Sequence, residues 1–181
     1  MNWRTLVDLA GFQLVWWACA LGAGYGRRST PGILAAALFL AIQMAIRGRS
    51  PTFYRTILAA GLIGFAGESL LVATGLVRYA APWPSEHLAP AWIVALWLSF
   101  GTTLEIVRQL VGSRPILTGA LLGAVLGPVA YCAAAHLGAL TFPAASELGL
   151  LVIAALWGLA LPTLLTVQAR SSKAHRPRWW R

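Results

Sequence analysis

Charged residues are scarce in this sequence: they make up 10% of its 181 residues, whereas an ordinary soluble domain has about 25%. Only five residues are acidic, and Asp8 is the only aspartate, which excludes the paired aspartates of an aspartyl protease. The only lysine, Lys173, lies close to the C-terminus, so no Schiff base to retinal can form within an apolar segment. The low charge indicates a chain that is surrounded mostly by lipid.

Several catalytic and cofactor-binding motifs are also missing. The two cysteines, Cys19 and Cys132, form neither a CxxC pair nor a disulfide framework. The sequence has no Gly-x-Ser-x-Gly elbow, no Walker motif and no glycine-rich dinucleotide loop. We therefore expect no bound cofactor, and we exclude a serine hydrolase and a nucleotide-driven machine.

Long apolar runs dominate what remains, since 59% of the residues are hydrophobic and the mean hydropathy is +0.71. Runs of roughly 17 to 25 residues can each cross the hydrocarbon core, and they lack the two-residue alternation of a membrane barrel. Backbone groups in lipid must be bonded within the segment, so each crossing should be a helix. We predict an all-α, polytopic six-helix bundle within residues 1–169, with a basic tail over 170–181. The six predicted spans are 5–26, 30–46, 56–77, 89–107, 115–140 and 144–168.

Positive residues are sorted between the two sides of these spans. Eleven of the fourteen fall on the side that carries both termini, and the other three are Arg27, Arg28 and Arg78. Because cytoplasmic loops retain Lys and Arg during insertion, both termini are predicted to be cytoplasmic. The same rule explains the basic excess without a nucleic-acid partner, and the basic tail is expected to rest on anionic membrane lipids.

One carboxylate interrupts the third predicted span, in the stretch GLIGFAGESLLVATGL. Glu68 lies thirteen residues beyond Arg55, about 20 Å into the hydrocarbon, where a charge facing lipid is unfavourable. Three glycines share its helical face and form a seam for a neighbouring helix: Gly61, Gly64 and Gly75. Glu68 is therefore predicted to point into the bundle, and desolvation favours its neutral form.

The fifth predicted span offers a partner for Glu68. Gly119, Gly123 and Gly127 recur every four residues, and Tyr131 is the next position on that ridge. We predict a hydrogen bond between Glu68 and Tyr131. Gln13, an amide in the first span that can bond a neighbouring helix, is the third residue of this candidate ligand or proton site. Near the end of the fourth span, Glu105 lies three residues before Arg108, a spacing that predicts an ion pair on one helical face.

Three stretches carry a resemblance to a known family: FQLVWWACALGA (12–23), AWIVALWLSF (91–100) and GPVAYCAAAHLGA (127–139). Together with Glu68 before an apolar turn, they resemble a family of small bacterial inner-membrane proteins classed as a domain of unknown function. The resemblance covers nearly the whole chain. It implies a helical protein of the bacterial inner membrane and mildly favours a lipid-related role, but it implies no substrate, catalytic residue or cofactor.

Two hypotheses about function remain open. The first is a non-enzymatic protein that binds or moves a small apolar or lipid-like molecule, with Glu68 as its buried polar anchor. The second is an intramembrane lipid-modifying enzyme with a metal or acid/base site at the outer face, formed by Glu86, His87, His136 and Glu147. A third hypothesis, less developed than these two, is an accessory role beside a membrane-protein partner. Convergence of the four outer side chains on one point would favour the enzyme.

Overall fold

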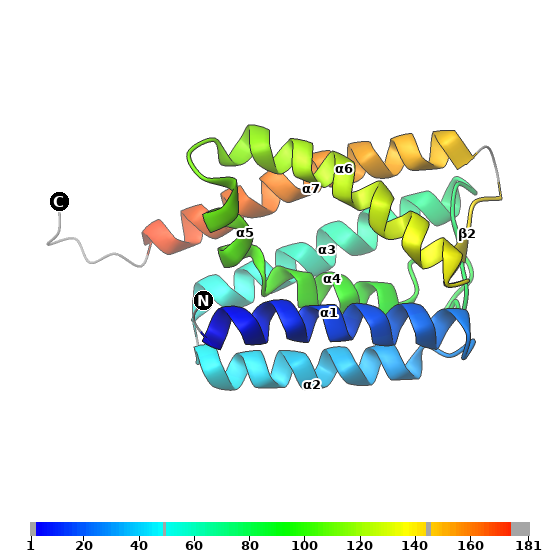
Figure 1. The fold of residues 1–181 in the computed structure, drawn as a ribbon, viewed down its shortest axis with the longest axis horizontal. Coiled ribbons are helices and arrows are strands. Elements are labelled where there is room, and N and C mark those ends of the chain that lie inside the picture. The colour runs from blue at the N-terminus through cyan, green and yellow to red at the C-terminus, as the bar shows by residue number, and fades with distance from the viewer. Residues whose placement is uncertain (1–2, 49, 144–145, 175–181) are drawn as a thin grey trace, which may run out of the picture.

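A computed structural model describes residues 3–48, 50–143 and 146–174, and these form seven helices and one pair of two-residue strands (Figure 1). The chain is helical, as predicted, and the strand pair is an unpredicted addition. Residues 175–181 of the predicted basic tail lie outside the described ranges. In chain order the elements are α1 (Trp3–Gly24), α2 (Thr30–Arg47), α3 (Pro51–Ala73), β1 (Arg78–Tyr79), α4 (Ala91–Gly101), α5 (Leu104–Val111), α6 (Pro115–His136), β2 (Leu140–Thr141) and α7 (Ser146–Ala174).

Five helices are long and apolar enough to cross a membrane, namely α1, α2, α3, α6 and α7. The predicted fourth span, 89–107, is instead broken into α4 and α5, which are bent by 56° and make a sixth crossing only if they are counted together. Ser99, Thr102 and Thr103 lie at this break, and their hydroxyls donate to backbone carbonyls three or four residues earlier. Such bonds compete with regular helix hydrogen bonding.

Proline marks the start of three helices. Pro31, Pro51 and Pro115 each occupy the first turn, where a missing N–H costs no hydrogen bond. In α2 the capping position belongs to Ser29, and Thr30 is already helical. These starts fix the short connections between the long helices.

The glycine seams lie inside the bundle, as predicted. A Cβ atom at Gly64 would lie 2.1 Å from the ring of Trp97 on α4, and one at Gly123 would lie 2.2 Å from the carbonyl oxygen of Trp157 on α7. The seam of α3 therefore packs on α4 and that of α6 packs on α7, rather than on each other. Gly75 is not part of the seam, because it follows α3 with a φ of +70° that favours glycine.

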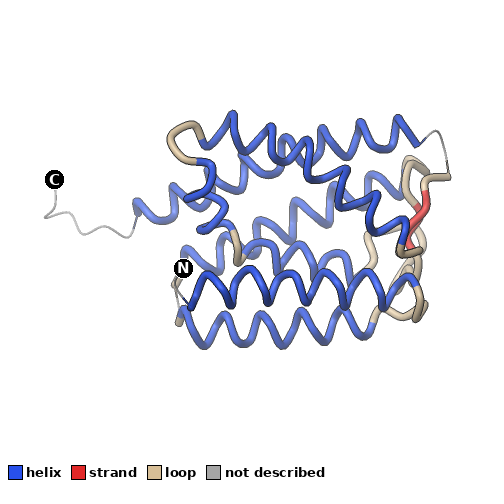
Figure 2. Tube along the Cα trace, in the orientation of Figure 1, coloured by secondary structure: helices blue, strands red, loops and turns tan. Residues whose placement is uncertain are grey.

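The helices run between two ends at which the loops gather (Figure 2). The start of α1, the end of α7 and α5 lie at one end, which we call the α5 end, and the strand pair lies at the other, the β end (Figure 1). Both termini of the described chain thus share one end, as an even number of crossings requires. Which end faces the cytoplasm stays a prediction.

Large apolar side chains cover the outside of the helices. On five different helices these side chains are more than half exposed, which suits contact with lipid tails and not with water. Examples are Leu14, Leu38, Leu62, Leu121 and Leu159. The buried polar side chains, among them Asp8, Gln43 and Glu68, lie inside this apolar coat.

Candidate functional site

Glu68 lies on α3 near the β end and is fully buried, with 0% of its surface exposed. The Trp97 indole N–H of α4 donates to its Oε1 atom at 2.7 Å, and the Tyr131 hydroxyl of α6 donates to the same oxygen. The Tyr79 hydroxyl of β1 donates to Oε2. These four residues, here called the Glu68 cluster, join three helices and a strand through one carboxyl group.

The surroundings of the Glu68 cluster hold its donors in place. The β1–β2 pair aligns Tyr79 with Leu140, and the Tyr79 ring packs edge-on against Trp92 with centroids 5.6 Å apart. The Trp97 ring stacks on Trp157 of α7, with centroids 4.3 Å apart and an interplanar angle of 21°. Aromatic packing from α4 and α7 therefore fixes two of the three donors.

The donors to Glu68 are neutral groups. The two ion pairs found in the described ranges join Arg47 to Asp8 and to Glu105, and neither includes Glu68. Burial, and then the neighbouring Glu68 carboxylate, raise the pKa of the Tyr79 hydroxyl well above its usual value near 10, so Tyr79 keeps its proton. A tyrosine hydroxyl can also accept a hydrogen bond, whereas an indole can only donate one. The two tyrosines can therefore bond Glu68 in either of its protonation states.

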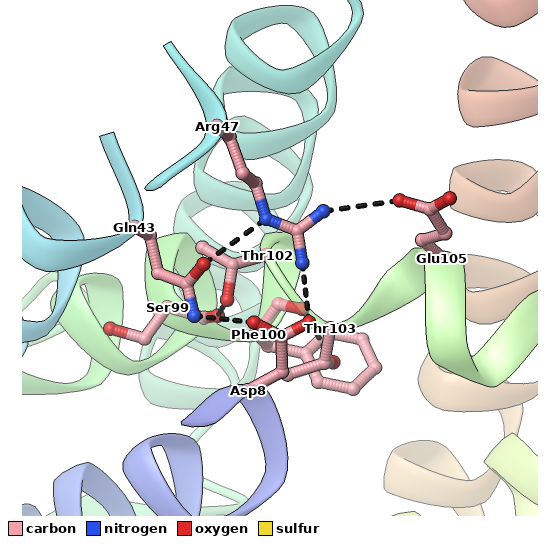
Figure 3. Close-up of polar contacts among 8 residues, drawn as sticks. All are labelled: Asp8, Gln43, Arg47, Ser99, Phe100, Thr102, Thr103 and Glu105. Carbon is pink, nitrogen blue, oxygen red and sulfur yellow. Dashed lines mark hydrogen bonds and ion pairs between the residues drawn. The ribbon is translucent and has the colours of Figure 1, made fainter. Parts of the chain in front are cut away.

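A second polar network occupies the α5 end and is formed by Asp8, Gln43, Arg47 and Glu105 (Figure 3). We call it the Arg47 network. The Arg47 guanidinium donates to Gln43 Oε1 and to Glu105 Oε2, each at 3.1 Å, and also to Asp8 Oδ2. The Gln43 amide donates to Asp8 Oδ1 at 2.6 Å. The network ties the start of α1 and the end of α2 to α5, beside the hydroxyls that mark the α4–α5 break.

The Arg47 network corrects one expectation. Glu105 pairs with Arg47 of α2 rather than with Arg108, because the bend at the α4–α5 break presents Glu105 to the end of α2. Gln43 of α2 bonds a neighbouring helix through Asp8 of α1.

The predicted site residues fall into three groups. The hydrogen bond between Glu68 and Tyr131 is confirmed. Gln13 is exposed on α1 and is not among the hydrogen-bond partners of Glu68, so it does not belong to the cluster. The expectation that Gln13 faces the interior of the bundle is wrong, because its side chain is exposed.

The proposed outer metal site is not assembled. Its members lie on separate elements: in the loop before α4, at the end of α6 and in the first turn of α7. Within the described ranges, no group of three or more His, Cys, Asp and Glu side chains is placed to hold a metal ion. The four exposed members of the predicted set are Glu86, His87, His136 and Glu147.

Sequence reasoning missed two donors in the Glu68 cluster and the central pair of the Arg47 network. Tyr79 had no usable signal, because its position depends on pairing with β2, which is distant in the sequence. Trp97 did have a signal in the sequence. A buried indole needs a hydrogen-bond partner, and Glu68 was the only acid deep in a predicted span. The pairing of Asp8 with Arg47 also had a signal in the sequence, because the start of one helix and the end of the next lie at the same end of a helical hairpin.

Comparison with known proteins places these residues within one family. The profile of a family described as "Protein of unknown function (DUF2878)" matches residues 5–163, a range that contains both the Glu68 cluster and the Arg47 network. No curated protein and no solved structure matches the chain.

Proposed function

We propose that this chain, which belongs to the DUF2878 family of proteins of unknown function, is a non-enzymatic integral membrane protein that binds or moves a small apolar or lipid-like molecule. The observation that carries the proposal is the full burial of Glu68 within a cluster of three donors from three other elements. Ionisable residues inside a membrane are costly and are retained mainly at sites of ligand or proton binding.

The chemistry of the Glu68 cluster supports proton exchange. When Glu68 is ionised it accepts three hydrogen bonds, and when it is protonated it can donate one to Tyr79 or Tyr131, whose hydroxyl oxygens also accept. The cluster can thus gain or lose a proton while its four elements stay joined. A site that couples the movement of a molecule to a proton needs this property.

A groove beside the Glu68 cluster supports the binding of a molecule. It encloses about 690 Å³ between the start of α2 and the loop that follows β1, within the range of about 300 to 1,000 Å³ typical of ligand pockets. Ile33, Leu34 and Trp83 give it apolar walls, and the charged residues Arg27, Arg28 and Glu86 also line it. The groove reaches Ala81, two residues beyond the strand that carries Tyr79. The Ser29 hydroxyl donates to the Ala81 carbonyl at 2.8 Å and ties the two sides of the groove together.

The Tyr79 strand provides a route from this groove to Glu68. The strand pair has two residues on each side, and movement of Tyr79 would break its ring packing on Trp92 and its hydrogen bond to Glu68. Displacement of Tyr79 would free Oε2 of Glu68 and open the cluster toward the groove. In this proposal Tyr79 acts as the gate and Glu68 as the polar anchor.

Complementation of a deletion strain with a Glu68→Gln variant tests the proposal. The readout is mass spectrometry of the membrane lipids, alongside the thermal stability of the purified protein. Glutamine keeps the shape and one acceptor oxygen but cannot titrate, so the variant should fold and fail to restore the lipid profile. Glu147→Gln makes the same chemical change at an exposed carboxylate and should restore it. If Glu68→Gln restores the profile fully, Glu68 is a structural anchor and the proposal is wrong.

The alternative of an intramembrane lipid-modifying enzyme has no comparable support. Its predicted residues are exposed on separate elements, and the described part of the chain offers no cluster of metal ligands.

A further inference from the structure

A second groove lies at the α5 end, opposite the Glu68 cluster, between α5, α6 and α7. It encloses about 290 Å³. Its apolar walls include Pro115, Ile116, Leu165 and Ala169, and two arginines from different helices lie at its edge: Arg108 and Arg170.

The positive charge of these two arginines is not neutralised by the protein. Both ion pairs found within the described ranges use Arg47, and neither includes Arg108 or Arg170. Glu105, the acid nearest to Arg108 in the sequence, is held by Arg47 of α2. No acidic residue lines the groove. It therefore presents two guanidinium groups to whatever occupies it.

The start of α6 adds further donors to the same place. Pro115 and Ile116 line the groove, and no side chain caps the N-terminus of this 22-residue helix. Uncapped N–H groups in a first helical turn, together with the helix dipole, favour an anion. The two arginines and the uncapped helix start are independent features, and both call for negative charge.

The apolar walls distinguish between a soluble anion and a lipid. Ile116 is 66% exposed and Leu117, the next residue of α6, is 55% exposed, so the groove opens onto the apolar coat of the bundle. A free phosphate would leave these walls unused, whereas a lipid would cover them with an acyl chain. Basic pockets between membrane helices are suited to anionic lipid headgroups.

We propose that this groove binds an anionic membrane phospholipid, with its phosphate between Arg108, Arg170 and the start of α6, and an acyl chain along Ile116 and Leu165. The site lies at the other end of the bundle from Glu68. It does not depend on the function proposed for the Glu68 cluster, and either can fail without the other.

Lipid titration of the full-length protein in a neutral detergent tests the site. Native mass spectrometry would measure the Kd for phosphatidylglycerol and for phosphatidylcholine with the same acyl chains. We expect tighter binding of phosphatidylglycerol, and a loss of roughly 25-fold in the variant R108Q/R170Q, since each positive charge contributes about fivefold. The matched control R4Q/R55Q removes two exposed charges that line neither groove and should leave the Kd unchanged.

A second variant separates groove binding from general attraction to a basic protein. Ala169→Phe fills the groove while keeping every charge of the chain, including the basic tail, so it should also weaken phosphatidylglycerol binding. If R108Q/R170Q does not fold, the Ala169→Phe variant alone tests whether the groove binds the lipid. Unchanged affinity in a folded variant of either kind overturns the proposal. Competition by glycerol phosphate at the same concentration as the lipid also overturns it, because that result identifies a soluble anion as the ligand.

Discussion

Replacement of Glu68 by leucine should destabilise the protein far more than replacement by glutamine. Leucine leaves three buried donors without an acceptor, those of Tyr79, Trp97 and Tyr131. Each unsatisfied donor costs about 1 to 3 kcal/mol, so the loss is on the order of 3 to 9 kcal/mol. Glutamine keeps an oxygen for Trp97 and Tyr131, and its amide can donate to the Tyr79 hydroxyl, so its cost should be about 1 kcal/mol.

SDS titration of the protein in mild detergent, followed by circular dichroism, would measure the free energy of unfolding of the leucine and glutamine variants. A double-mutant cycle would then measure the coupling between Tyr79 and Glu68. Tyr79→Phe should cost about 1 kcal/mol in the wild-type background and less in the Glu68→Leu background, where its hydroxyl already lacks a partner. Equal stability of the leucine and glutamine variants would refute the reasoning, since it would mean that the three donors do not depend on the carboxyl group.

Three further outcomes follow from the packing and the charges. Gly123→Leu should lower the free energy of unfolding by about 1 to 3 kcal/mol, because its Cβ would meet the Trp157 carbonyl. The control Ala133→Leu, on the exposed face of α6, should be tolerated. Equal melting temperatures of the two variants would contradict the packing of this glycine seam. Arg47→Gln should cost about 3 kcal/mol by leaving Asp8 buried without its partner, and adding Asp8→Asn should recover part of that loss; an additive double mutant would argue against the pair. Reporter fusions should place both termini in the cytoplasm, and an external C-terminus would overturn the predicted orientation.

Hydropathy predicted five of the crossings because it depends on composition over a whole helix. It could not predict the break between α4 and α5, since the residues on either side form a continuous apolar run. At the break, the hydroxyls of Ser99, Thr102 and Thr103 bond to nearby backbone carbonyls. Hydroxyls lower the average hydropathy little, but they can replace the regular bonding of a helix backbone.

The Glu68 cluster was only partly predictable for a related reason. Helical periodicity placed Tyr131 on the same ridge as the glycines of α6, and that ridge faces the interior. Periodicity says nothing of a loop, so Tyr79 remained hidden until β1 and β2 were seen to pair. For Gln13, the apolar sequence around it left the direction of its side chain undetermined.

The break between α4 and α5 makes α4 depend on the helices that precede it in the chain. α4 has 11 residues and is about 16 Å long, roughly half of the hydrocarbon thickness. Alone in lipid, such a bent segment would expose backbone groups that have no partner there. In the folded protein α4 packs against α1, α2 and α3, all of which are translated before it. The first three helices therefore form the surface against which α4 packs, and without them residues 91–101 would lose the contacts that cover them.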